Sequence, residues 1–263
     1  MEVFEYKKNN SSKFIIIILL IIVFIAGYAL ATYFPFINND VEVVEEVVET
    51  DEPYEVEESE PFDSEVKSND ATDAYFEDAL FVGDSRMEGL VTNASIENLN
   101  AITSIGMTVQ TAVEDELIRD GDEKITVLQK LEQEEFSKIY LMLGTNELGW
   151  AYPEIFIEKY SELIDEIKIS KPNAIIYILS IMPVNEKLIE NSEYKNNAHI
   201  SEVNLLLKDM CDNKGIYFLN IYDLVYDEEM GLNLEASTDG LHLGPTYCNK
   251  VFDYLKDHYV EVK

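Results

Sequence analysis

Residues 78–90 read DALFVGDSRMEGL, and this stretch decides the fold. The apolar run 79–82 has the composition of a buried strand, and it ends at once in Gly83, Asp84 and Ser85. A more helical stretch follows. Two interpretations compete: a turn with a helix N-cap, for which serine is a favoured residue, or a nucleophile held at the end of a strand.

Four more apolar runs follow the first, and each has the length of a strand. They lie in the segments 100–106, 137–144, 173–183 and 216–223. Unbroken apolar strands are typical of a sheet that is buried on both faces, hence of a parallel sheet. Apolar residues at helical spacing occupy the segments 153–172, 198–215 and 244–262. Strands that alternate with helices predict an α/β domain with a parallel sheet over residues 74–263.

The charge of the chain is strongly negative and unevenly distributed. The 263 residues carry a formal net charge of -33. Fifteen acids and one lysine give residues 40–73 a net charge of -14, whereas residues 1–39 carry +1 and residues 74–263 carry -20. This balance argues against a nucleic-acid partner, because such partners need a basic surface.

An uncharged apolar run of 21 residues lies near the N-terminus, at residues 14–34. About 20 apolar residues span a bilayer as a helix. Lysines precede the run and acids follow it, so the positive-inside rule predicts a single-pass signal anchor in the cell membrane. Residues 1–13 are then cytoplasmic and the body is extracytoplasmic. The alternative is a cleaved signal peptide with a small-residue cleavage site at 29–31.

Residues 35–73 connect this run to the body. Their acidic part contains two prolines and little apolar surface, and its like charges repel one another. We therefore predict a disordered acidic stalk that acts as a spacer.

A serine nucleophile needs a base, a group that orients the base, and donors for the developing oxyanion. The chain has three histidines: His199, His242 and His258. The surroundings of His199 and His258 indicate surface or helix-end positions, whereas His242 lies in a loop three residues after Asp239. Each feature alone also fits a simple turn, since an Asp-Gly pair commonly forms one. Their joint occurrence after strands and in loops favours a catalytic site.

Four stretches, FVGDSRMEGL, SIGMT, LGTNEL and DGLHL, resemble in order the four sequence blocks of the SGNH hydrolases, also called GDSL esterases. The resemblance covers about residues 77–257. It implies Ser85 as nucleophile, His242 as base and Asp239 as orienting acid. The backbone N–H groups of Ser85 and Gly106 and the side chain of Asn146 then form the oxyanion hole. The implied fold is a three-layer α/β/α sandwich with a five-stranded parallel sheet, of flavodoxin-like type.

The sequence departs from the family pattern at two positions. Arg86 stands where the first block has leucine, and Glu147 stands where many members have aspartate. We consider Arg86 a candidate for the substrate pocket, together with Trp150 and Tyr152, which follow the third block. Aromatic residues at such a junction also often cover the core.

The resemblance and the predicted topology together imply a membrane-anchored extracytoplasmic serine esterase that acts through an acyl-enzyme. Its expected substrate is a small-molecule or carbohydrate ester, above all O-acetyl groups on a surface or wall carbohydrate. One alternative is an O-acyltransferase that uses the same acyl-enzyme, and another is a non-catalytic wall-binding or scaffold protein. We predict no cofactor and no metal, because no His/Cys cluster with ligand spacing occurs. The sequence gives no oligomeric state.

Overall fold

The computed structural model describes residues 71–189 and 195–260, and these residues belong to one compact unit. The predicted cytoplasmic segment and signal anchor lie outside the described residues, as does the predicted stalk except for its last three residues. Within the part of the chain that is described, no helix combines the length and the hydropathy that a membrane span requires.

Five parallel strands form the central sheet, as predicted. In spatial order they are β2 (Asn100–Thr103), β1 (Ala79–Gly83), β5 (Lys138–Met142), β6 (Ile175–Leu179) and β7 (Tyr217–Leu219). Counted along the chain this is the order 2-1-3-4-5, which is the flavodoxin-like arrangement. Sites in such sheets lie at the carboxyl ends of the strands, at the point where the order reverses, and here that point lies beside β1.

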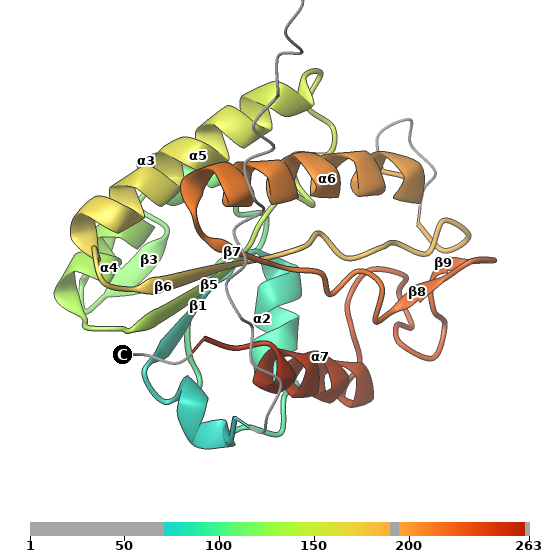
Figure 1. Ribbon diagram of the computed structural model, residues 1–263, viewed down its shortest axis with the longest axis horizontal. Helices are drawn as coiled ribbons and strands as arrows, with labels where there is room; N and C mark the ends of the chain where they lie inside the picture. The colour runs from blue at the N-terminus through green and yellow to red at the C-terminus, as the bar shows by residue number, and fades with distance from the viewer. Residues whose placement is uncertain (1–70, 190–194, 261–263) are drawn as a thin grey trace, which may run out of the picture. The chain divides into compact units, whose positions relative to one another are not determined.

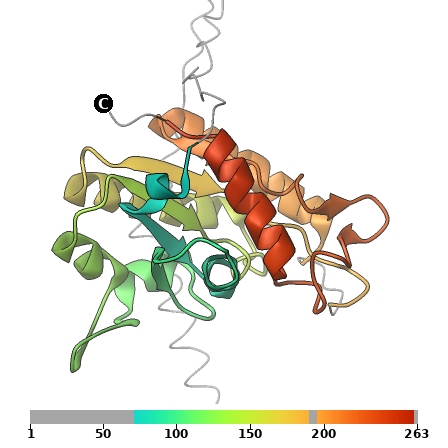
Figure 2. The same cartoon turned by 90° about the horizontal axis from the view of Figure 1, so that it is seen from below.

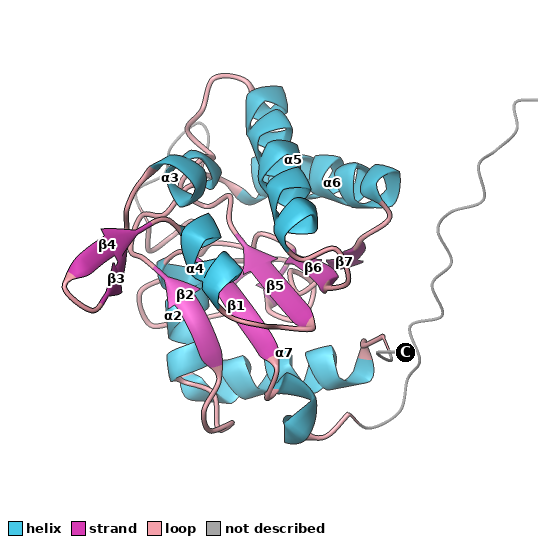
Figure 3. Ribbon diagram, turned by 90° about the vertical axis from the view of Figure 1, so that its left-hand side faces the viewer, coloured by secondary structure: helices cyan, strands magenta, loops and turns pink. Residues whose placement is uncertain are grey.

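Helices cover both faces of the sheet and form the two outer layers of a three-layer sandwich (Figure 1, Figure 3). One face packs against α3 (Val109–Glu114), α4 (Val127–Gln133), α5 (Pro153–Ser170) and α6 (Asn197–Lys214). The other face packs against the 3-10 helix η1 (Asp73–Phe76), α2 (Ser85–Thr92) and α7 (Pro245–Asp257). Figure 2 shows α7 lying obliquely beside the end of α2. The three helices expected from apolar spacing are α5, α6 and α7.

The strand side chains alternate between the two layers because successive residues of a strand point to opposite faces. Leu80 and Val82 of β1 enter the core beneath α3–α6. Phe81 enters the other core and stacks on Tyr140 of β5, which in turn stacks on Tyr177 of β6, with ring centroids 4.9 and 4.5 Å apart. Both faces of these strands are therefore buried, which explains the unbroken apolar runs in the sequence.

Two short hairpins and two short helices were not expected. The strands β3 (Ile118–Asp120) and β4 (Glu123–Ile125) pair antiparallel, as do β8 (Tyr226–Asp227) and β9 (Gly231–Leu232). Strands of two or three residues are too short to show a period. The helices α3 and α4 have six and seven residues, and threonine capping boxes begin both.

The turn after β5 depends on Gly144, and its substitution gives the first prediction. The residue has φ +128°, and a Cβ atom there would lie 2.4 Å from Ile181 Cδ1. Gly144→Ala should therefore lower the free energy of unfolding by about 2–4 kcal/mol in urea titrations, through backbone strain and overpacking. Gly149→Ala, whose Cβ would meet nothing within 4 Å, is the matched control. Equal unfolding midpoints for the two variants would contradict this reading.

Candidate active site

The structure shows which residue caps the helix that follows β1. Asp84 is the N-cap of α2, because its Oδ1 accepts a hydrogen bond of 2.8 Å from the backbone N–H of Arg86. Ser85 is the first residue of the helix, and its side chain is half-buried. The capping role thus falls to the aspartate, which leaves the Ser85 hydroxyl free of it.

The Ser85 hydroxyl lies against His242, which is 157 residues away in the chain. Ser85 Oγ is 3.0 Å from His242 Nε2, and His242 Nδ1 is 2.8 Å from Asp239 Oδ2. An ionised carboxylate only accepts hydrogen bonds, so His242 carries its proton on Nδ1 and donates it in a hydrogen bond to Asp239. The lone pair of Nε2 then faces the serine hydroxyl, as a general base requires.

Asp239 is held in the charged form by several donors. Its Oδ1 accepts hydrogen bonds from the backbone N–H groups of Leu241 and His242 at 2.9 and 2.8 Å and from the Ser237 hydroxyl at 2.9 Å. Burial raises the pKa of this carboxyl, but the hydrogen bonds from His242, Leu241 and Ser237 outweigh it and hold the pKa well below its usual value. A carboxylate that stays ionised can orient and stabilise an imidazolium.

Besides the Ser85 N–H, the two other candidate oxyanion donors follow β2 and β5. Gly106 has φ +77° in the exposed turn after β2, and this turn is tied to β1 by the Ser104 N–H, which donates to the Gly83 carbonyl. Asn146 Nδ2 donates to Asp84 Oδ2 at 3.1 Å and to the Met107 carbonyl at 3.0 Å. The amide thus joins the nucleophile turn to the Gly106 turn, with both of its N–H groups directed at protein acceptors.

Glu147 fixes the same turn from inside the protein. Its side chain is buried, and Oε1 accepts a hydrogen bond of 2.6 Å from the backbone N–H of Val109 at the start of α3. The other oxygen, Oε2, is buried without a hydrogen-bond partner. Burial, assisted by the nearby charge of Asp84, raises the pKa of Glu147 to about 7.

This raised pKa predicts a pH-dependent cost in stability. Because the folded-state pKa lies above the usual 4.5, the folded protein binds a proton that the unfolded chain has already lost. The stabilisation from that proton is complete below about pH 4.5 and disappears as the pH rises through 7. Glu147→Gln mimics the neutral form, so at pH 8 the variant should exceed the wild type by up to about 3 kcal/mol in unfolding free energy. Denaturant titrations at pH 5 and pH 8 measure the difference in unfolding free energy between the variant and the wild type. The same difference at both pH values would exclude the effect.

The three candidates for the substrate pocket lie in different surroundings. Arg86 is only 2% exposed, so the structure does not place it in a pocket: its guanidinium donates to the carbonyls of Met182 at 2.7 Å and Pro183 at 2.8 Å. Trp150 is half-buried and packs against the core beneath α5. Tyr152 is 65% exposed at the start of α5 and remains accessible to a ligand.

Sequence reasoning missed two residues that shape the site. Ser237 donates to Asp239, and Asn185 N–H donates to the carbonyl of Gly240 at 2.9 Å. Ser237 stands two residues before Asp239 and could have been considered as its partner. Asn185 gave no signal, since its contact joins segments that are 55 residues apart.

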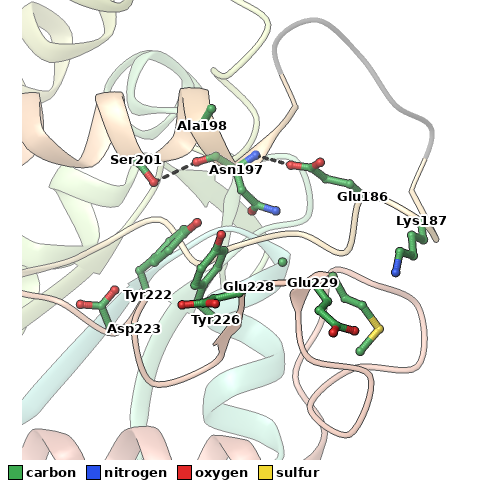
Figure 4. A pocket seen from close by; sticks show the side chains of 12 residues that line it. Glu186, Lys187, Asn197, Ala198, Ser201, Tyr222, Asp223, Tyr226, Glu228 and Glu229 are labelled. Carbon is green, nitrogen blue, oxygen red and sulfur yellow. Dashed lines mark hydrogen bonds between the residues drawn. The ribbon is translucent and has the colours of Figure 1, made fainter.

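A separate cavity of about 590 Å³ lies between the start of α6 and the β8–β9 hairpin (Figure 4). Tyr222 and Tyr226 stack there with ring centroids 5.0 Å apart, and carboxylates such as Glu228 and Glu229 outnumber the single Lys187. Its lining, within the described ranges, includes none of the residues Ser85, Asp239 and His242. Nor does the described part of the chain contain a group of three or more His, Cys, Asp or Glu side chains that could hold a metal ion.

A profile of the GDSL-like lipase/acylhydrolase family matches residues 81–246. The match covers more than half of the chain and includes the last residues of β1 before Ser85 as well as the Asp239–His242 loop. The protein therefore belongs to this family of ester-hydrolysing enzymes, and the resemblance seen in the four sequence blocks is confirmed. A sequence search of curated proteins finds no match.

Solved structures with the same fold include several acylhydrolase-type proteins. A protein of Streptococcus pneumoniae, described provisionally as a platelet activating factor, is 23% identical, with a TM-score of 0.56 over 68% of this chain and 82% of its own. An acetyl xylan esterase is 16% identical, with a TM-score of 0.51 over 67% and 96%. A family 3 carbohydrate esterase of Clostridium thermocellum is 18% identical, with a TM-score of 0.50 over 68% and 93%. At these identities the likeness shows the fold.

Proposed function

We propose that the protein is a serine esterase that uses Ser85 as nucleophile, His242 as general base and Asp239 as orienting acid. The observation that carries this proposal is the continuous chain of contacts from Ser85 Oγ to His242 Nε2 and from Nδ1 to Asp239. Both contacts are within the reach that a nucleophile and its base require. Membership of the acylhydrolase family supports the assignment.

The reaction is acyl transfer through a covalent intermediate. His242 takes the proton from Ser85 as the hydroxyl oxygen attacks the ester carbonyl, and the imidazolium then donates this proton to the leaving alcohol. A water molecule next attacks the acyl-enzyme while His242 acts as base again. The acid is released, and the Ser85 hydroxyl is restored.

The oxyanion that forms in each step needs donors near Ser85. The N–H groups of Ser85 and Gly106 have no protein acceptor among the contacts of the described residues and are available for it. Asn146 serves as the third donor once one of its N–H groups turns from the Met107 carbonyl toward the oxyanion. Each donor is worth about 2.7–4 kcal/mol in the transition state.

The proposed substrate is an acetyl ester on a carbohydrate outside the cytoplasm. The uncharged run of 21 residues near the N-terminus supports anchoring in the cell membrane, and the acidic segment supports a spacer. An acetyl xylan esterase shares the fold. The net charge of -20 on residues 74–263 disfavours strongly anionic polymers at low salt and favours neutral, acetylated glycans.

Acetate release by the full-length protein tests the proposal. Purified protein in detergent is incubated with O-acetylated glycans and with a small aryl acetate, and a fluorophosphonate probe labels the active serine. We expect acetate release and labelling, both lost in Ser85→Ala. Transfer of acetyl to a glycan acceptor in excess of hydrolysis would make the protein an acyltransferase, and absence of labelling would make it a non-catalytic binding protein.

A further inference from the structure

Arg86 is a buried charge directly after the proposed nucleophile. The side chain is 2% exposed, and a buried guanidinium is costly unless its N–H groups are bonded. Nη1 and Nη2 donate to two successive carbonyls, those of Met182 and Pro183, but the buried Nε has no partner. An apolar side chain of similar volume would fill this space without the cost of burying a charge.

The two carbonyls belong to the segment that leaves the carboxyl end of β6. Three residues after Met182, this segment reaches the loop of the proposed base: Asn185 N–H donates to the Gly240 carbonyl at 2.9 Å. A Cβ atom on Gly240 would lie 3.1 Å from Asn185 Cβ, so the two backbones are in close contact. Asn185 is itself fixed, since its Nδ2 donates to the Leu232 carbonyl at 2.9 Å.

Gly240 lies between Asp239 and His242. A continuous connection therefore leads from the start of α2 through Arg86, the segment Met182–Asn185 and Gly240 to the proposed base. The positive charge of Arg86 also attracts two carboxylates. Asp84 lies at the α2 end of this connection, and Asp239 lies at the end that carries His242. Ser85 and His242 are 157 residues apart in the sequence, and this segment contacts both the start of α2 and the loop that carries His242.

We propose that Arg86 is a positioning residue, which holds the Met182–Asn185 segment between the Ser85 turn and the His242 loop and so sets the distance from Ser85 Oγ to His242 Nε2. The proposal rests on the proposed function, because it needs Ser85 and His242 to react together. It also assigns a role to the arginine that replaces the leucine of the family pattern. A misplacement of about 1 Å can cost 10²-fold in rate.

The test compares Arg86→Met with Arg86→Lys and Asn185→Ala in the full-length protein, with a small aryl acetate as substrate. For Arg86→Met we expect kcat to fall about 10- to 100-fold with KM within twofold, and fluorophosphonate labelling of Ser85 to slow by the same factor. Arg86→Lys, which keeps the charge and part of the donors, should recover some of this loss. Asn185→Ala removes the side-chain bond to the Leu232 carbonyl that fixes the segment, so it should also lower kcat. The double variant should lose less than the product of the two single effects.

Lys138→Met is the matched control. Lys138 is also a buried cation, 3% exposed and bonded to Asp78, but it lies at the amino end of β5, away from Ser85. Its variant should keep the wild-type kcat. A wild-type kcat in Arg86→Met, a change in KM alone, or an equal loss in Lys138→Met would overturn the proposal. If Arg86→Met does not fold, a wild-type kcat in both Arg86→Lys and Asn185→Ala overturns it. If the wild type shows no esterase activity and no labelling, the proposed function itself has failed.

Discussion

Ser85→Ala should lower the kcat of ester hydrolysis on the order of 10⁶-fold, the largest effect expected from any single substitution. In the proposed mechanism the Ser85 hydroxyl oxygen attacks the carbonyl, so without it no acyl-enzyme can form. The His242 base then has no nucleophile within its 3.0 Å reach. Steady-state hydrolysis of an aryl acetate measures the loss, and mass spectrometry after fluorophosphonate treatment shows whether any serine still carries the probe.

Ser180→Ala provides the control for this prediction. Ser180 is fully buried after β6, and its Oγ accepts a hydrogen bond from the backbone N–H of Tyr222, so its loss should affect stability and leave kcat near the wild-type value. Ser85 is only half-buried, and Asp84 provides the helix cap. Ser85→Ala should therefore unfold at nearly the wild-type urea concentration. Substantial activity in a folded Ser85→Ala protein would remove Ser85 from the mechanism.

The parts of the fold that could be predicted are those with a repeated apolar pattern. The strands β1, β5 and β6 are buried on both faces, and α5, α6 and α7 show helical spacing, so their residues indicate their structure directly. Ser85 follows β1 and Asn146 follows β5. These two parallel strands are neighbours, so both residues lie at the carboxyl ends of the sheet's strands. The hairpins β3–β4 and β8–β9 consist of strands of two or three residues, which are too short to show a repeated pattern.

The sequence predicts those residues of the candidate site whose side-chain type suits only a few chemical roles. It does not predict contacts that arise only when distant segments pack together. A histidine three residues after an aspartate permits an Asp–His hydrogen bond within one loop, and the structure places the two atoms 2.8 Å apart. Arg86 was a candidate for the substrate pocket because it stands where the first block of the family has leucine. Its real partners are two backbone carbonyls almost a hundred residues away, and sequence contains no signal for backbone acceptors.

Asp239→Asn should lower kcat by about 10⁴-fold while it preserves the fold. In the wild type, Oδ1 accepts three hydrogen bonds and Oδ2 faces His242 Nδ1. The asparagine can satisfy those three donors only with its carbonyl oxygen, so its NH₂ group must face Nδ1. Nδ1 then becomes the acceptor, the proton moves to Nε2, and the imidazole can no longer take the proton of Ser85.

The loss should appear in kcat at unchanged KM, because in the proposed mechanism Asp239 acts through His242, to which it is bonded. Ser237→Ala is the comparison, since it removes one of the three donors to Oδ1 and leaves the charge and the tautomer of His242 intact. Its loss in kcat should stay below about tenfold. Activity of Asp239→Asn within tenfold of the wild type would show that the charge and acceptor geometry of Asp239 do not govern His242. Water would then have to stabilise the tautomer of His242 that carries its proton on Nδ1. Water can reach the ring, because 37% of the histidine side chain is exposed.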